Sequence, residues 1–280
     1  MRLFSFLLLI FGLSACNLDL PSADGPNFSS LEYFYLAQEK HNHGKFDTAY
    51  VLYTAAIETA PEEPEFYYER GRVLYDMDRY KEALADYAQA IKLEGGRAKY
   101  YHAQAVIYAE QQQFDLALPA LRKAVEINPE NPSLHSLLGD LHLQQGDTLG
   151  ALDDYQAFLR LQPQRPDFRD KLANIYYSLG NMKGARKEAE LALRMDDKNA
   201  NYYYTYALIL SEQSEDALAL DACRKALNLD PTQRDFYYLA AVMALNMQET
   251  EEACGYLQKA ADAGDEDAAE LQAEYCAQNS

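Results

Sequence analysis

A block of 34 residues recurs along most of the chain, and this period constrains the fold more than any other feature of the sequence. Small residues keep the same phase in every copy, because the eighth residue is always alanine or glycine and the twentieth is always alanine. A fixed period of roughly 20 to 50 residues indicates a repeat architecture, in which each unit buries its apolar face against its neighbours. The seven blocks begin at residues 30, 64, 98, 132, 166, 200 and 234.

The second block, residues 64–97, illustrates what one unit is expected to form. Tyr67, Gly71 and Leu74 have the spacing of one helix face, and a second set of small and aromatic residues follows with the same spacing. Asp78 lies in the polar segment between the two sets and is expected to cap the second helix. Each block is therefore predicted to be a hairpin of two α-helices.

The repeated hairpin resembles the tetratricopeptide repeat over residues 30–267. The family often has tryptophan at the fourth position, whereas this chain has no tryptophan and mostly uses tyrosine there. The resemblance implies an all-α, right-handed superhelical solenoid of seven hairpins, followed by a capping helix and tail over residues 268–280. A short stretch at residues 259–268 resembles the close of Sel1-like repeats. The seven implied repeats are 30–63, 64–97, 98–131, 132–165, 166–199, 200–233 and 234–267.

The N-terminal segment has the pattern of a secretion signal. Arg2 precedes the apolar stretch Leu3–Leu13, which is shorter than the roughly 20 residues that a membrane-spanning helix needs. The letters LSAC that end at Cys16 resemble the lipobox of bacterial lipoproteins. That resemblance implies that residues 1–15 are a cleaved signal peptide and that Cys16 carries a diacylglyceride and an acyl chain such as palmitate. Residues 16–29 contain proline, glycine and serine and are expected to be a flexible tether.

The residues after Cys16 suggest where the lipid would place the protein. In well-studied diderm lipoproteins, an aspartate directly after the lipidated cysteine retains the protein at the inner membrane. This chain has Asn17 there, and Asp19 is the only acidic residue nearby. We therefore expect an outer-membrane protein that faces the periplasm.

Charge and motifs exclude several classes of function. The formal charge of −19 at pH 7 argues against a nucleic-acid partner, which requires a basic surface. The chain has no nucleophile elbow, phosphate-binding loop, dinucleotide fingerprint or zinc motif, so neither enzymatic activity nor a cofactor is expected. His135 and His142 are seven residues apart, whereas a helical metal pair is usually four apart, so no metal site is expected.

The resemblance also assigns a concave partner-binding groove. In the family, positions 2, 5, 9 and 12 of each block tend to face it, and tyrosine at such positions suits a protein-binding surface. The alternative is that many of these tyrosines pack between adjacent repeats. A carboxylate clamp is not expected, because the fifth position never holds a lysine. The implied groove residues are Phe34, Tyr68, Arg72, Tyr75, His102, Asn174, Tyr177, Tyr204 and Tyr238.

The cysteines other than Cys16 have different expected roles. Cys254 and Cys276 each lie eleven residues from Asp265, which falls at a predicted turn, so an antiparallel helix pair would bring them opposite each other. The periplasm permits disulfides, and we predict a Cys254–Cys276 bond. The alternative is two unpaired cysteines in a helix interface. Cys223 falls at a packing position and is expected to be a small buried apolar residue.

These features predict a non-catalytic scaffold anchored by lipid in the bacterial cell envelope. It would hold a protein or peptide partner in its groove to assemble or stabilise a complex, and would be a monomer outside that complex. One alternative is an assembly lipoprotein of a pilus or secretion apparatus. The others are a glycan-binding lipoprotein, which a tyrosine-rich groove would permit, and a cell-wall enzyme.

Overall fold

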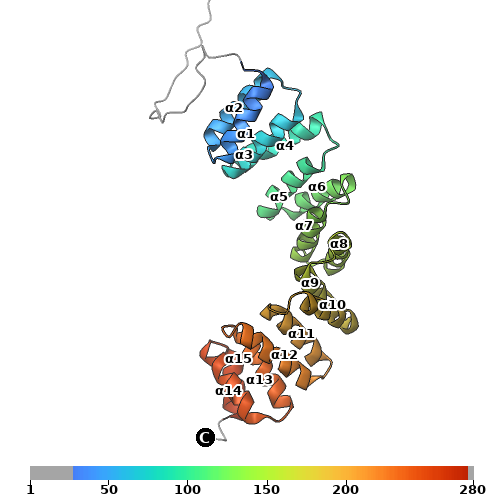
Figure 1. The fold of residues 1–280 in the computed structure, drawn as a ribbon, viewed down its shortest axis with the longest axis vertical. Coiled ribbons are helices and arrows are strands. Elements are labelled where there is room, and N and C mark those ends of the chain that lie inside the picture. The colour runs from blue at the N-terminus through green and yellow to red at the C-terminus, as the bar shows by residue number, and fades with distance from the viewer. Residues whose placement is uncertain (1–27, 277–280) are drawn as a thin grey trace, which may run out of the picture. The chain divides into compact units, whose positions relative to one another are not determined.

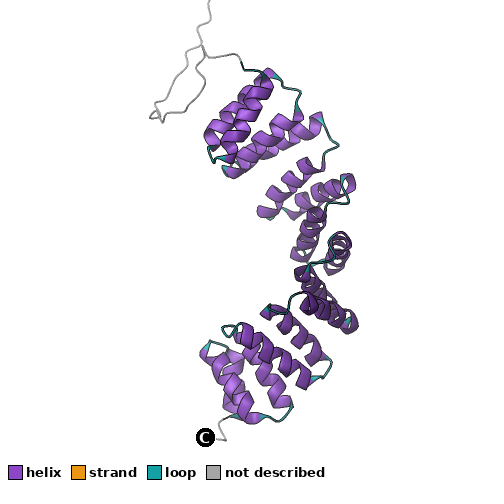
Figure 2. Ribbon diagram, viewed as in Figure 1, coloured by secondary structure: helices purple, strands orange, loops and turns teal. Residues whose placement is uncertain are grey.

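The computed structural model describes residues 28–276, and every regular element in that part of the chain is an α-helix (Figures 1 and 2). The first helix of each hairpin begins at the first residue of a sequence block. These first helices are α1 (Ser30–Asn42), α3 (Pro64–Asp76), α5 (Ala98–Glu110), α7 (Pro132–Gln144), α9 (Pro166–Ser178), α11 (Ala200–Glu212) and α13 (Arg234–Asn246). The second helices are α2 (Phe46–Thr59), α4 (Tyr80–Leu93), α6 (Phe114–Ile127), α8 (Thr148–Leu161), α10 (Met182–Met195), α12 (Asp216–Leu229) and α14 (Thr250–Asp262).

The predicted all-α architecture of repeated helical hairpins is thus confirmed. One further helix, α15 (Glu266–Tyr275), follows the seventh hairpin and begins two residues before the expected capping helix. The side chain of Asp265 caps it by accepting a hydrogen bond from the Ala268 amide at 3.0 Å. The signal peptide, Cys16 and nearly all of the tether lie outside the described residues. No helix among residues 28–276 is long and apolar enough to cross a membrane.

The helices belong to two compact units, divided between Ile127 and Asn128. The first unit contains α1 to α6 and the second contains α7 to α15. Within each unit, every helix packs against the helices that precede and follow it. The core of each unit is therefore a series of contacts between sequence neighbours, as expected for a repeat protein.

Small residues explain how the two helices of a hairpin approach each other. The alanine at the twentieth position is completely buried in all seven repeats. Because the alanine side chain is only a methyl group, it keeps the two helix backbones little apart, and they can pack closely at this point. These alanines are Ala49, Ala83, Ala117, Ala151, Ala185, Ala219 and Ala253.

The turn inside each hairpin has one backbone conformation throughout. The fifteenth residue of every repeat has a φ angle between 57° and 77°, in the left-handed region. Three repeats have glycine there. The other four have a residue with a side chain, for which this backbone conformation is unfavourable. Asp78 is one of the four, so it does not cap α4 as expected: Arg79 occupies the cap position, and Asp78 instead accepts a hydrogen bond from the Tyr80 hydroxyl at 2.8 Å.

The first hairpin differs from the others on the face that no earlier repeat covers. The tenth residue is a buried aliphatic side chain in repeats two to seven, but in the first repeat it is the exposed Glu39. A charged residue at this position gives the array a polar end, which repeat proteins require for solubility. The aliphatic residues at the tenth position are Val73, Ile107, Leu141, Ile175, Ile209 and Met243.

Candidate partner-binding surface

Phe34 is a core residue, so the expectation that it lines a binding groove is wrong. Its side chain is only 8% exposed, and its ring centroid lies 5.0 Å from that of Phe66 and 5.7 Å from that of Tyr53. A phenyl ring has no polar tip to keep in water, and the two neighbouring rings offer an apolar surface on which it is buried. The fifth position is therefore buried in the first repeat and only partly buried in the other six.

In the first unit, Tyr68 and Arg72 lie on α3 but differ in how available they are. The Tyr68 ring is half-buried against Tyr87 and Tyr100, and the Lys99 ammonium lies 4.5 Å from its centroid. Arg72 is exposed and donates a hydrogen bond to Glu69 at 2.9 Å. The packing alternative therefore describes Tyr68 well, whereas the Arg72 guanidinium is accessible to a partner.

His102 on α5 is half-buried, and this burial lowers the pKa of its imidazole. The lowered pKa keeps the ring neutral at pH 7, because an unperturbed histidine already titrates near 6.5. A neutral, largely enclosed ring can offer one hydrogen bond to a partner but no charge.

Two of the expected groove tyrosines use their hydroxyl groups inside the protein. Tyr75 donates to Glu110, and Tyr177 donates to Glu212 at 3.2 Å. In both cases the acceptor lies 35 residues later, on the first helix of the next repeat, and His41 pairs with Asp76 in the same way. These contacts tie neighbouring repeats together, and a search for ring–carboxylate pairs at this spacing would have found them in the sequence.

Asn174 belongs to a polar cluster between α9 and α11 in the second unit. Its amide nitrogen donates to the Asp170 main-chain oxygen at 2.9 Å and lies 3.2 Å from the Asp170 carboxylate and 3.4 Å from the Thr205 hydroxyl. One Asp170 oxygen is buried without a partner, and burial raises the pKa of this carboxyl to about 6. Sequence reasoning did not single out Thr205, which no charge or motif marks.

Tyr204 and Tyr238 line a pocket of about 510 Å³ in the second unit. We call it the Tyr204–Tyr238 pocket; its other lining residues are Arg234, Asp235 and Gly264–Asp267. The Tyr204 ring lies 4.8 Å from the Phe236 ring, which fixes its position. Arg234 donates to the Gly264 main-chain oxygen at 3.3 Å and lies 3.4 Å from the Asp235 carboxylate. The acidic wall formed by the turn before α15 and the first residues of α15 was not predicted from the sequence.

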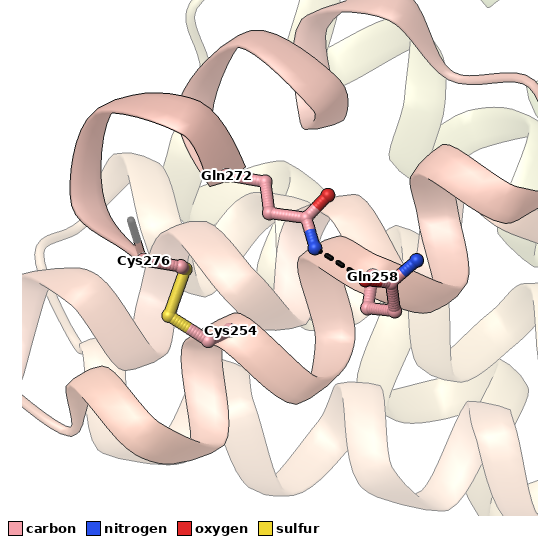
Figure 3. The surroundings of a disulfide bond; sticks show 4 residues. All are labelled: Cys254, Gln258, Gln272 and Cys276. Atoms are coloured by element: carbon pink, nitrogen blue, oxygen red, sulfur yellow. Dashed lines mark hydrogen bonds between the residues drawn. A yellow bond between two sulfur atoms is a disulfide. The ribbon is translucent and has the colours of Figure 1, made fainter. Parts of the chain in front are cut away.

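The last two helices are joined covalently, as Figure 3 shows. The sulfur atoms of Cys254 and Cys276, the pair that the sequence predicts, form a disulfide with a Cα–Cα distance of 5.8 Å. Beside it, the Gln272 amide donates to Gln258 at 2.6 Å. Cys223 is free and completely buried, and burial raises the pKa of its thiol to about 12. Within residues 28–276, no group of three or more histidine, cysteine or acidic side chains is placed to hold a metal ion.

Known structures share this architecture. The C-terminal part of a repeat protein from Cytophaga hutchinsonii gives a TM-score of 0.71 at 15% identity, over 85% of this chain and 98% of that chain. A tetratricopeptide repeat protein from Parabacteroides merdae gives 0.57 at 19% identity, over 87% and 97%. The pilF protein of Pseudomonas aeruginosa gives 0.58 at 19% identity, over 74% and 94%. At these identities the likeness shows the fold alone.

Comparison of the sequence with protein families is more specific. No curated protein matches the chain. Four family models, each described as a tetratricopeptide repeat, match residues 64–96, 102–166, 142–209 and 200–233. These matches together cover more than half of the chain, and two of them, 64–96 and 200–233, coincide with single repeats. The chain therefore belongs to the tetratricopeptide repeat family.

Proposed function

We propose that this protein is a non-catalytic scaffold in a bacterial cell envelope, which binds a protein or peptide partner and thereby assembles or stabilises a complex. Membership of the tetratricopeptide repeat family supports a protein-interaction scaffold. The observation that carries the proposal is the set of accessible polar and aromatic groups on first helices, namely Arg72, Asn174 and the Tyr204–Tyr238 pocket. Aromatic and arginine side chains are the residues on which protein interfaces most often depend.

The envelope location rests on the N-terminal sequence. The apolar stretch and the letters LSAC up to Cys16 support a lipid anchor, and Asn17 supports the outer membrane facing the periplasm. A disulfide at the C-terminal end is compatible with an oxidising compartment. We propose no nucleic-acid partner, since the charge of −19 would repel one, and a monomeric state outside the complex.

Crosslinking in intact cells tests the scaffold directly. The tagged full-length protein is crosslinked, purified and analysed by mass spectrometry. We expect crosslinks from Lys99 or Lys171, which lie on first helices, to one enriched envelope protein. Arg72→Ala should reduce that crosslink, whereas Glu130→Gln, in an exposed loop, should not. Recovery of no enriched protein would contradict the proposal and favour glycan binding.

Fractionation tests the lipid anchor. Cys16→Ser removes the thiol that would carry the diacylglyceride, so the variant should move from the membrane fraction to the soluble fraction. Ser14→Thr, which leaves the cysteine in place, is the control and should stay with the membrane. A Cys16→Ser protein that remained membrane-bound after washing would exclude lipid as the anchor.

A second candidate is an assembly lipoprotein of a pilus or secretion apparatus. The lipoprotein signal together with a repeat array of this length favours it, and pilF of Pseudomonas aeruginosa has a similar fold. The crosslinking experiment separates the two candidates, because this one requires the enriched protein to be a component of such an apparatus.

A further inference from the structure

We infer that the Tyr204–Tyr238 pocket receives a lysine or arginine side chain from a basic segment of the protein partner. This inference rests on the proposed function and deepens it by naming the chemistry of the partner.

The pocket is a built concavity within one unit. Residues from α11 and α13, from the turn that precedes α15 and from the first residues of α15 line it, and its volume is about 510 Å³. Sites that bind small ligands occupy roughly 300 to 1,000 Å³, so this pocket has room for one or two long side chains. The disulfide between Cys254 and Cys276 holds α15 against α14 and so steadies one wall.

The charge of the pocket is negative. Four carboxylates line it, Asp235, Asp265, Glu266 and Asp267, against the single guanidinium of Arg234. Acidic residues in a first helical turn are common, because they complement the partial positive charge of about half a unit at a helix start. Two helix starts meet here, so this charge reduces the excess of carboxylates but does not cancel it.

The cation already present does not neutralise the excess. Arg234 donates to the Gly264 main-chain oxygen and approaches only Asp235, at 3.4 Å. Glu266 and Asp267 have no ion-pair partner among residues 28–276. Both are exposed and can therefore turn toward an incoming ammonium or guanidinium group.

The two tyrosine rings lack a contact that similar rings elsewhere in the chain possess. The Lys99 ammonium lies 4.5 Å from the centre of the Tyr68 ring, and the Lys259 ammonium lies 5.2 Å from that of Tyr237. Within the described residues, neither Tyr204 nor Tyr238 has such a cation, and neither hydroxyl has a hydrogen-bond partner. A cation from a partner would make the contact that the chain makes internally at several other tyrosines.

Another hollow of the same unit has the opposite charge. Arg160, Arg169 and Lys187 line it together with Glu188, and its volume is about 330 Å³. The negative charge of the Tyr204–Tyr238 pocket is therefore not a general property of every hollow in this strongly acidic chain. A basic segment would be directed to one and not to the other.

Fluorescence anisotropy with two synthetic peptides tests the inference on the full-length protein in detergent. One peptide alternates lysine with serine, and the other replaces each lysine with glutamate. We expect the lysine peptide to bind, with affinity that falls as salt rises, and the glutamate peptide not to bind. Asp235→Asn with Asp267→Asn should raise the Kd of the lysine peptide about tenfold. The matched control, Glu130→Gln with Asp197→Asn, removes two exposed carboxylates of the same unit and should change the Kd less than about twofold.

A ring substitution separates the aromatic contribution from charge alone. Tyr238→Phe keeps the aromatic face and should retain binding, whereas Tyr238→Leu should lose it. Equal losses in the pocket variant and in its matched control would overturn the inference, as would equal binding of both peptides. If the crosslinked cellular partner binds the Asp235→Asn, Asp267→Asn variant normally, this inference fails and the scaffold stands. If no cellular partner exists, the proposed function fails whatever the peptides do.

Discussion

At the scale of the residue, two glycines mark where a tyrosine ring enters a hairpin. A Cβ atom at Gly71 would lie 2.5 Å from the Tyr87 ring, and one at Gly139 would lie 2.5 Å from the Tyr155 ring. Both distances are shorter than any van der Waals contact, so a methyl group at either glycine would displace the ring from its present position, although the first repeat combines Ala37 with the buried Tyr53 at the same two positions. The third and seventh repeats have alanine at the eighth position and leucine in place of the tyrosine.

This pairing makes a stability prediction. Gly71→Ala should lower the free energy of unfolding by about 1 to 3 kcal/mol, because the ring must move out of its rotamer or push the backbone. Tyr87→Leu in the same chain should recover part of the loss, since leucine fills this position beside alanine elsewhere. Urea denaturation followed by circular dichroism measures both changes.

Gly255→Ala is the control for that experiment. Gly255 lies in α14, and a Cβ atom there would meet nothing within 4 Å. Alanine in an open helical site should stabilise the protein by about 0.5 to 1 kcal/mol. A Gly71→Ala variant as stable as wild type would show that the Tyr87 ring moves without cost.

Asp170 predicts a dependence of stability on pH. Burial raises its pKa from 3.8 to about 6 in the folded protein, so folding favours the protonated form. That stabilisation is complete below about pH 4 and is lost as the pH rises through about 6, at a cost of about 2 to 3 kcal/mol. In Asp170→Asn, the free energy of unfolding should decrease less between pH 4 and 6 than it does in the wild type. The exposed Asp197→Asn should leave it unchanged, and equal slopes in both variants would refute the assignment.

At the scale of the element, three hairpins carry a largely buried polar pair between their two helices, whereas the others have no acidic residue at the same position of the second helix. In each pair an arginine or histidine on the first helix faces the acidic residue at position 23 on the second. A buried pair contributes little net stability, but the loss of one partner is costly because the other charge stays buried. The pairs are Arg70 with Asp86, His142 with Asp154 and Arg169 with Glu188.

The disulfide predicts how the last element opens. Cys254→Ala with Cys276→Ala should destabilise α15 by about 3 kcal/mol in the chain-entropy model, because the unfolded segment regains its freedom. Hydrogen exchange should then quicken at the amides of α15 and remain nearly unchanged in α12. Cys223→Ala, which removes a thiol outside the bond, is the control and should leave exchange in α15 slow. Unaltered exchange in the double variant would mean that packing alone holds α15.

At the scale of the whole molecule, the period predicted the number and placement of the hairpins, because small residues at fixed positions determine where two helices can meet. The period did not predict which of the expected groove residues would be available to a partner. Phe34 is buried, and the hydroxyls of Tyr75 and Tyr177 donate hydrogen bonds to the next repeat. The side chains that neighbour each residue determine this, and they are not part of the repeated pattern. The sequence predicted the two tyrosines of the Tyr204–Tyr238 pocket but not its acidic wall, which comes from the end of the seventh repeat and the start of α15.

The division of the chain predicts that its second unit folds alone. The fragment 128–280 contains whole hairpins and complete hydrophobic clusters, so it should keep its helical content and unfold cooperatively. Circular dichroism and limited proteolysis measure this. A fragment that begins at residue 148 lacks α7 and leaves α8 without its hairpin partner, so it should be cut faster at its N-terminal end. Equal sensitivity of the two fragments would contradict this account.

The left-handed residue at the fifteenth position recurs in all seven turns, and the first helices start at strictly constant intervals. A gene that encodes such a chain can gain or lose one entire period and keep every buried alanine facing its partner. A change of any other length would shift the phase of everything downstream. The number of hairpins in this protein can thus change in evolution by duplication or loss, one hairpin at a time.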